Sequence, residues 1–72
     1  MSSLLVECGV ALYGPRWQTE VARDLGVSDR TVRRWVAGTA SIPVGIYTDL
    51  QRMTKERAST LEALAVRLLE AP

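Results

Sequence analysis

The amino-acid sequence predicts an all-α domain of four or five helices, and three observations support this. Apolar residues recur at spacings of three and four, which is the period of an amphipathic helix. Glycine or proline interrupts this pattern repeatedly up to Gly45, whereas residues 46–69 contain neither. No stretch alternates strictly between apolar and polar residues, as a half-buried strand does. We expect a single domain over residues 1–72, because a chain of this length forms one small core.

The first expected helix runs to about Leu12. Ser2 or Ser3 can cap it, because a serine hydroxyl accepts a hydrogen bond from a free first-turn amide. Gly14 and Pro15 end it, since proline cannot continue a helix. Its predicted inward face consists of apolar residues at helical spacing, namely Leu5, Cys8 and Leu12, widened by Leu4 and Ala11.

Two short helices are expected on either side of a tight turn at Gly26, since glycine adopts positive φ freely. The earlier helix begins near Trp17. The later one, from about Asp29 to Ala37, has Ser28 as a good N-cap and ends at Gly38. The residues predicted to face inward are Val21, Ala22, Leu25, Val27, Val32 and Trp35. Trp17 either packs beside the first helix or contacts a DNA backbone.

The last helical segment covers residues 43–70 and starts at Pro43, a residue that favours the first turn of a helix. The segment is either one long helix or two helices separated near Thr54, and we favour one. Its apolar stripe comprises Ile46, Leu50 and Met53, continued by Leu61, Leu64 and Leu68.

The stretch 18–35, QTEVARDLGVSDRTVRRW, combines the residue types that a helix-turn-helix unit needs. The steep helix crossing leaves room only for a small side chain, which Ala22 supplies, and Gly26 supplies the turn. The net charge of the chain is only +1, but five arginines lie between residues 16 and 34. This local excess on a short helix pair favours a nucleic-acid partner.

Residues 17–50, and QTEVARDLGVSDRTVRRWVAG above all, resemble the phage repressor and Cro type of helix-turn-helix proteins, also called the XRE or lambda-repressor-like family. The resemblance implies a compact DNA-binding domain in a bacterial cytoplasm or nucleoid. Small phage and prophage regulators, including anti-CRISPR-associated ones, have this size. The sequence departs from the family at Ala37, where asparagine is common, and in residues 43–69, where the family has two separate helices.

The resemblance implies two sets of DNA contacts. Base edges would be contacted by residues at the start of the later motif helix and one turn on, namely Ser28, Asp29, Arg30, Arg33 and Arg34. Phosphates would be contacted by Gln18, Thr19, Thr31, Thr39 and Ser41. An arginine donates two hydrogen bonds to guanine O6 and N7 in the major groove. Asp29 either accepts from a cytosine amine or caps its helix and orients an arginine.

A solvated basic face, with Arg33 paired to Asp29 four residues earlier, is the other interpretation of these arginines. Trp35 is expected in the core rather than stacked on a base.

The C-terminal segment is apolar on more than one side, which exceeds what one helix of a small domain can bury. We expect Leu61, Leu64, Ala65, Leu68 and Leu69 to pair two chains about a two-fold axis. Two such chains would place their DNA-contacting helices about 34 Å apart, one turn of DNA, on an inverted repeat. The other interpretation is that this segment covers the first helix of its own chain.

The expected function is therefore a homodimeric regulator of transcription that binds double-stranded DNA, acting as a repressor by occupying a promoter. The alternative is a protein-interaction adaptor that keeps the fold without recognising a DNA sequence. The chain has no histidine and one cysteine, so we expect no zinc or other metal site and no internal disulfide. Because the sequence also shows no paired carboxylates in an evident pocket and no glycine-rich phosphate loop, we expect no cofactor and no enzyme activity. We also expect no small-molecule ligand and no membrane segment. Cys8 is expected to be a small apolar residue rather than a reactive thiol.

Overall fold

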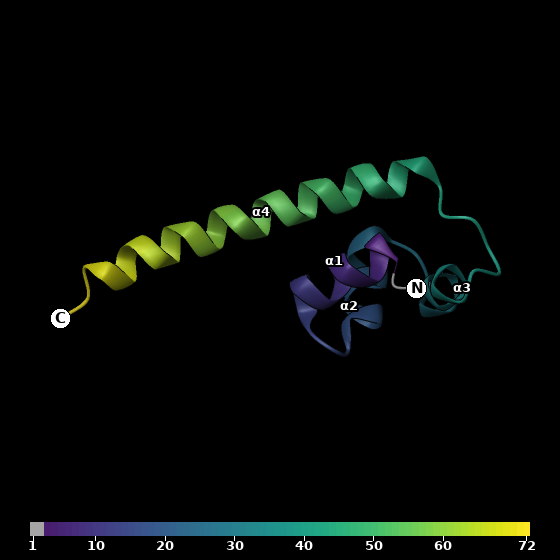
Figure 1. Ribbon diagram of the computed structural model, residues 1–72, viewed down its shortest axis with the longest axis horizontal. Helices are drawn as coiled ribbons and strands as arrows, with labels where there is room; N and C mark the ends of the chain where they lie inside the picture. The colour runs from purple at the N-terminus through teal and green to yellow at the C-terminus, as the bar shows by residue number, and fades with distance from the viewer. Residues whose placement is uncertain (1–2) are drawn as a thin grey trace.

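The computed structural model describes residues 3–72, which form four helices and no strand. Helices α1 (Leu4–Tyr13), α2 (Trp17–Leu25) and α3 (Asp29–Ala37) form a small body, and α4 (Val44–Leu69) lies along it and extends past it (Figure 1). The all-α prediction is confirmed.

The helix ends follow from the residues at them. The hydroxyl of Ser3 accepts a hydrogen bond from the Val6 amide at 3.2 Å, and Ser28 caps α3 in the same way. The alternative cap, Ser2, lies outside the described residues. Gly26 and Gly38 end α2 and α3 in the left-handed conformation, with φ of 73° and 78°. Side chains with a Cβ rarely adopt this conformation, which explains glycine at both positions.

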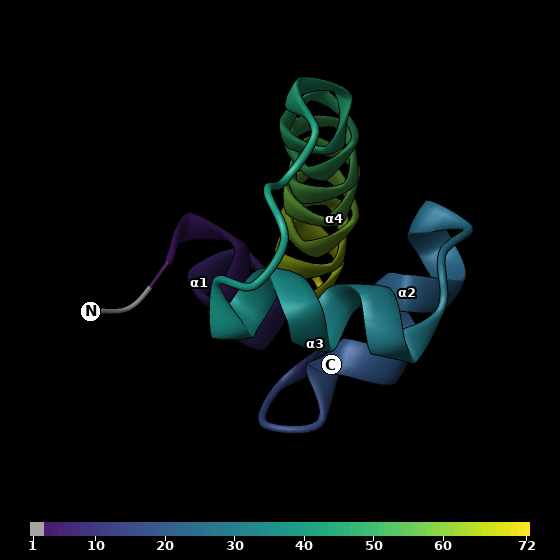
Figure 2. The same ribbon diagram turned by 90° about the vertical axis from the view of Figure 1, so that its right-hand side faces the viewer.

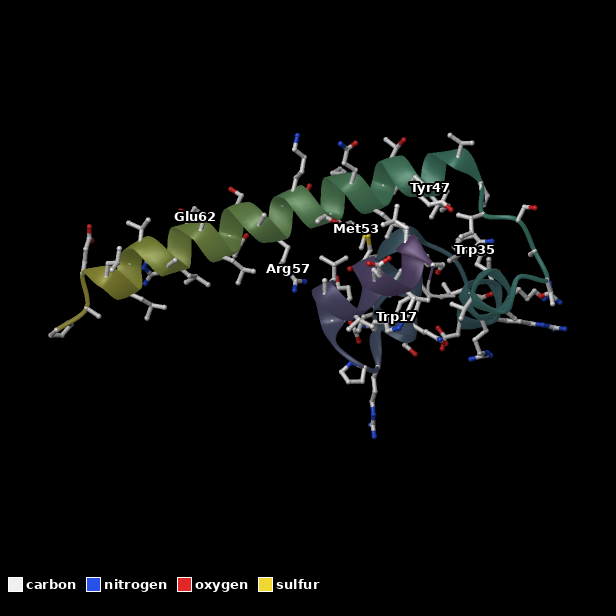
Figure 3. All side chains as sticks on the ribbon, in the orientation of Figure 1. Trp17, Trp35, Tyr47, Met53, Arg57 and Glu62 are labelled. Carbon is white, nitrogen blue, oxygen red and sulfur yellow. The ribbon has the colours of Figure 1, made fainter. Side chains whose placement is uncertain are left out.

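The core lies where α1, α2, α3 and the first half of α4 meet, and Trp17 belongs to it. The indole of Trp17 packs on Gly9, where an added Cβ would lie 2.1 Å from a ring atom. Figure 3 shows Trp17 and Trp35 within the body of the molecule. The buried apolar residues are Leu5, Leu12, Trp17, Val21, Ala22, Val32, Trp35, Leu50 and Met53.

The inward face of α1 differs from the prediction. Leu4 and Ala11 are exposed and Cys8 is half-buried, because the buried line of α1 runs through Leu5, Gly9 and Leu12. The Trp17 ring packs against Gly9, which places Gly9 in the buried line, and Cys8 packs at the margin of the core.

Helix α4 is continuous over 26 residues, about 39 Å. It passes through Thr54, whose hydroxyl donates to the Leu50 carbonyl at 2.7 Å, so the favoured single helix is confirmed. Only its first half is covered. Every residue from 58 to 69, which we call the overhang, is exposed. Ala58 and Leu61 border a cavity beside α1, but the overhang buries none of its residues there, so the interpretation that this segment covers α1 is wrong.

The molecule is less compact than the sequence predicts. Its extents are 51 × 23 × 22 Å and its radius of gyration is 14.3 Å, against about 11 Å for a compact domain of this length. The overhang causes the difference (Figure 1). Within residues 3–72, no helix combines the length and apolar character needed to cross a bilayer.

Candidate nucleic-acid interface

The turn between α2 and α3 is held by main-chain hydrogen bonds. The Val27 amide donates to the Ala22 carbonyl at 3.0 Å, and the Gly26 amide donates to the Arg23 carbonyl at 3.2 Å. Ala22 is fully buried, as expected for the small residue at a close helix crossing. These contacts fix how α3 stands relative to α2.

The arginines of α3 lie opposite its buried side. Val32 and Trp35 are buried, whereas Arg30, Arg33 and Arg34 are exposed. Arg30 and Arg34 are four residues apart and therefore neighbours on the helix surface. Figure 2 shows α3 running across the front of the molecule with α4 receding behind it. The exposure of the three arginines leaves their side of α3 open to a partner.

The acidic side chains nearest in sequence are engaged elsewhere. Glu20 forms an ion pair with Arg23 at 3.1 Å, and Asp24 accepts a hydrogen bond from the Tyr13 hydroxyl. Asp29 accepts from the Thr19 hydroxyl at 3.1 Å. The ion pairs found in residues 3–72 involve Arg23 and Arg52 only, so the Arg33–Asp29 pair is not formed there. The three arginines of α3 thus keep their charges available.

Three predicted contact residues instead secure the ends of α3. The Ser28 hydroxyl accepts from the Thr31 amide at 3.1 Å and lies 3.0 Å from the Thr31 hydroxyl. At the other end, the Thr39 hydroxyl donates to the Arg34 carbonyl at 3.3 Å. The structure gives Ser28, Thr31 and Thr39 a capping role, and their contact with DNA stays a prediction.

The start of α2 lies beside the start of α3, since Thr19 of α2 bonds to Asp29 of α3. Its N-cap residue, Arg16, makes no side-chain hydrogen bond to the first-turn amides. Such amides attract anions, including phosphate. Gln18 is half-buried in the same turn, and Ser41 is exposed in the loop after α3. The structure thus brings the first turn of α2, through Thr19, next to Asp29 of α3, and a phosphate contact of Gln18 or Thr19 stays a prediction.

A cluster that the sequence did not predict joins α1, α2 and α4. The Arg57 guanidinium donates to the Leu12 carbonyl at 2.5 Å and lies 5.0 Å from the centre of the Tyr13 ring, while Tyr13 bonds to Asp24. Figure 3 shows Arg57 pointing from α4 toward the end of α1. No sequence signal pairs Arg57 with Leu12, 45 positions earlier. The cluster fixes the orientation of the three-helix body against α4.

The pKa of Tyr13 is raised above its usual 10.0, chiefly because its hydrogen bond to Asp24 requires the protonated hydroxyl. Burial and the negative charges of Asp24 and Glu20 act in the same direction, whereas the positive charge of Arg57 opposes them.

In the part of the chain that the structure describes, no group of three or more histidine, cysteine, aspartate or glutamate residues could hold a metal ion. Comparison of the chain with protein-family models, with curated proteins and with solved structures finds no match.

Proposed function

We propose that the protein binds double-stranded DNA sequence-specifically and regulates transcription, with α2 and α3 acting as a helix-turn-helix of the lambda-repressor-like kind. One observation carries the proposal. Arg30, Arg33 and Arg34 are exposed on the side of α3 opposite its buried residues, outside any ion pair within residues 3–72. A short, rigid helix presenting unpaired arginines matches the shape and charge of the major groove.

In the proposed complex, α3 lies in the major groove. Arg30 and Arg34 are one turn apart and contact neighbouring base pairs, each donating two hydrogen bonds where the base is guanine. Gln18 and the uncapped amides of α2 bind a phosphate beside the groove, and Ser41 approaches the backbone after α3. The Thr19–Asp29 hydrogen bond holds these two groups of contacts at a fixed distance.

Regulation follows from occupancy. Two chains bound to an inverted repeat that overlaps a promoter exclude polymerase, so we propose a repressor of the phage or prophage type. Anti-CRISPR-associated regulators belong to the same size class. The protein would act in the bacterial cytoplasm or nucleoid, where its DNA target lies.

A second candidate is an adaptor that binds another protein through α4. The observation in its favour is the exposed apolar overhang, in which Leu68 and Leu69 have 73% and 87% of their surfaces exposed. An adaptor would bind DNA weakly through its arginines and without sequence preference.

Selection of bound duplexes from a random DNA pool tests the proposal and discriminates between the two candidates. The proposal predicts that a few rounds enrich one motif and that an Arg30→Ala/Arg34→Ala variant enriches none. Recovery of random sequences by the wild-type protein would contradict the proposal and favour the adaptor.

A further inference from the structure

Helix α4 carries a second apolar line beside the one that packs on α1. It runs through Thr54, Ala58, Leu61, Ala65 and Leu68, and we call these five residues the seam. Their alternating spacings of four and three are the repeat by which two helices pack side by side in a coiled coil. All five residues are exposed and none is charged.

The seam borders an apolar groove between α1 and α4. A cavity of about 450 Å³ there is lined by Cys8 and Ala11 of α1 and by Thr54, Ala58 and Leu61 of α4, among others. A second cavity of about 220 Å³ continues the groove past Cys8 to Leu4 and Tyr47. Small side chains leave this space empty beside the seam.

The exposed area of the isolated chain is large for its mass. It is 5383 Å², whereas a compact monomer of 7.9 kDa exposes about 4,400 Å². The excess of roughly 1,000 Å² matches the area of about 800 Å² that each partner contributes to a stable interface. Both the excess exposed area and the coiled-coil spacing of the seam fit a second copy of the chain as the occupant.

We propose that two copies pair through their α4 helices side by side and antiparallel, with Leu61 opposite the partner's Ala65 and Ala58 opposite the partner's Leu68. Each large residue then meets a small one, as close packing requires. The partner's Leu68 enters the cavity beside Ala58 and Cys8. A parallel pair would set Ala58 against the partner's Ala58 and leave the cavity empty.

Pairing through the seam would also allow both chains to contact the same DNA duplex. The two-fold axis stands perpendicular to both α4 helices, so both three-helix bodies lie on the same side of the pair. Pairing through the line that continues the core side, at Leu64, would instead place the bodies on opposite sides.

The register sets the distance between the two α3 helices, and this step rests on the proposed function. The two-fold axis passes level with Ala63, which follows Val44 by 19 residues. In both views α3 lies at the N-terminal end of α4 (Figures 1 and 2). The helix length from Val44 to Ala63 is counted once for each chain, so the two α3 helices lie at least about 57 Å apart. That is closer to two turns of DNA, about 68 Å, than to the single turn expected from the sequence.

Sedimentation equilibrium of Ala65→Glu and Ala63→Glu tests the pairing without DNA. Both alanines are exposed on the overhang, but Ala63 lies outside the seam. The wild-type protein and Ala63→Glu should sediment at micromolar concentration with twice the mass of one chain, and Ala65→Glu with the mass of one, all with equal helix content. A monomeric wild type, or equal behaviour of the two variants, would overturn the proposal.

Disulfide trapping tests the direction of the pair. In Leu68→Cys, the new thiol lies beside the partner's Cys8 if the pair is antiparallel, so oxidation should give a covalent dimer with an 8–68 linkage. The control, Cys8→Ser/Leu68→Cys, should stay uncrosslinked, because the two residues 68 are then about 15 Å apart along the helices. A parallel pair would crosslink the control through residue 68 and overturn the antiparallel register.

The spacing is tested with duplexes that hold two selected half-sites at varied separation. A separation near two turns should bind at least tenfold more tightly than one turn. Preference for one turn would overturn the register. A wild-type dimer that binds none of the duplexes would contradict the proposed function and leave the pairing standing.

Discussion

The hydroxyl of Thr19 donates to the carboxylate of Asp29 at 3.1 Å, which ties the first turn of α2 to the first turn of α3. Both residues were predicted to contact DNA, Thr19 at a phosphate and Asp29 at a base. Their mutual bond gives Asp29 a positioning role: it fixes the start of α3 relative to the proposed phosphate-binding turn, and its charge favours the helix N-terminus.

Asp29→Ala should therefore reduce the discrimination between the selected site and random DNA more than it reduces DNA binding itself. Loss of a negative charge near the phosphates raises affinity for random DNA, while loss of the Thr19 bond lowers affinity for the selected site. The ratio of the two Kd values, from fluorescence anisotropy, should fall about tenfold. Asp29→Asn, which keeps an acceptor for Thr19, should retain more of the ratio. If both affinities change by the same factor in Asp29→Ala, the positioning role is wrong.

Replacing Arg30 or Arg34 with alanine should weaken binding to the selected site by about 1–3 kcal/mol and relax the preference at one base pair. Gln18→Ala serves as the control, because a phosphate contact weakens specific and random binding about equally. Titrations on the selected duplex and its single-base variants measure both effects. Unchanged affinity in both arginine variants at moderate salt would remove them from the interface.

Gly9→Ala should destabilise the fold by about 1–3 kcal/mol, because the new Cβ overlaps the buried Trp17 ring and forces it to move. Gly45→Ala is the matched control: it is also a helical glycine, but apart from its chain neighbours and the backbone of its own helix no atom lies within 4 Å of its added Cβ. It should stabilise α4 by up to about 1 kcal/mol. Urea unfolding followed by tryptophan fluorescence compares the two. Equal effects at both positions would contradict the Trp17–Gly9 contact.

The raised pKa of Tyr13 predicts a loss of stability in alkaline solution. A group whose pKa is higher in the folded state stabilises the fold below its unfolded pKa of about 10, and this contribution disappears as the pH rises through the folded pKa. The free energy of unfolding should thus fall more steeply above pH 10 in the wild type than in Tyr13→Phe. Parallel pH profiles would show that the Tyr13–Asp24 bond has no effect on stability.

The local features of the fold could be predicted from sequence, because they depend on residues within one turn of each other. The Ser28 cap, the Gly26 and Gly38 helix ends and the continuous α4 are confirmed. The Trp17–Gly9 contact and the Arg57–Tyr13–Asp24 cluster could not, since they join separate helices whose orientation the periodicity does not define. The isolated glycine within α1 was the available signal, because such a glycine often marks a close approach.

In the candidate site, too, some features could be predicted from the sequence and others depend on tertiary contacts. Residue spacing alone predicts that Arg30, Arg33 and Arg34 lie away from the buried side of α3, and they do. Which acidic residues compete for them depends on tertiary contacts. Asp29 was predicted as a possible partner for Arg33, but the side chain of Thr19, ten residues earlier in the chain, binds it instead.

The most direct test of sequence-specific binding is a competition at 150 mM salt between a labelled selected duplex and unlabelled DNA. The unlabelled selected duplex should displace the label at a concentration at least a thousandfold lower than a shuffled duplex of equal length and composition, which is the lower range for specific DNA-binding proteins. Displacement by both duplexes at the same concentration would contradict sequence-specific binding.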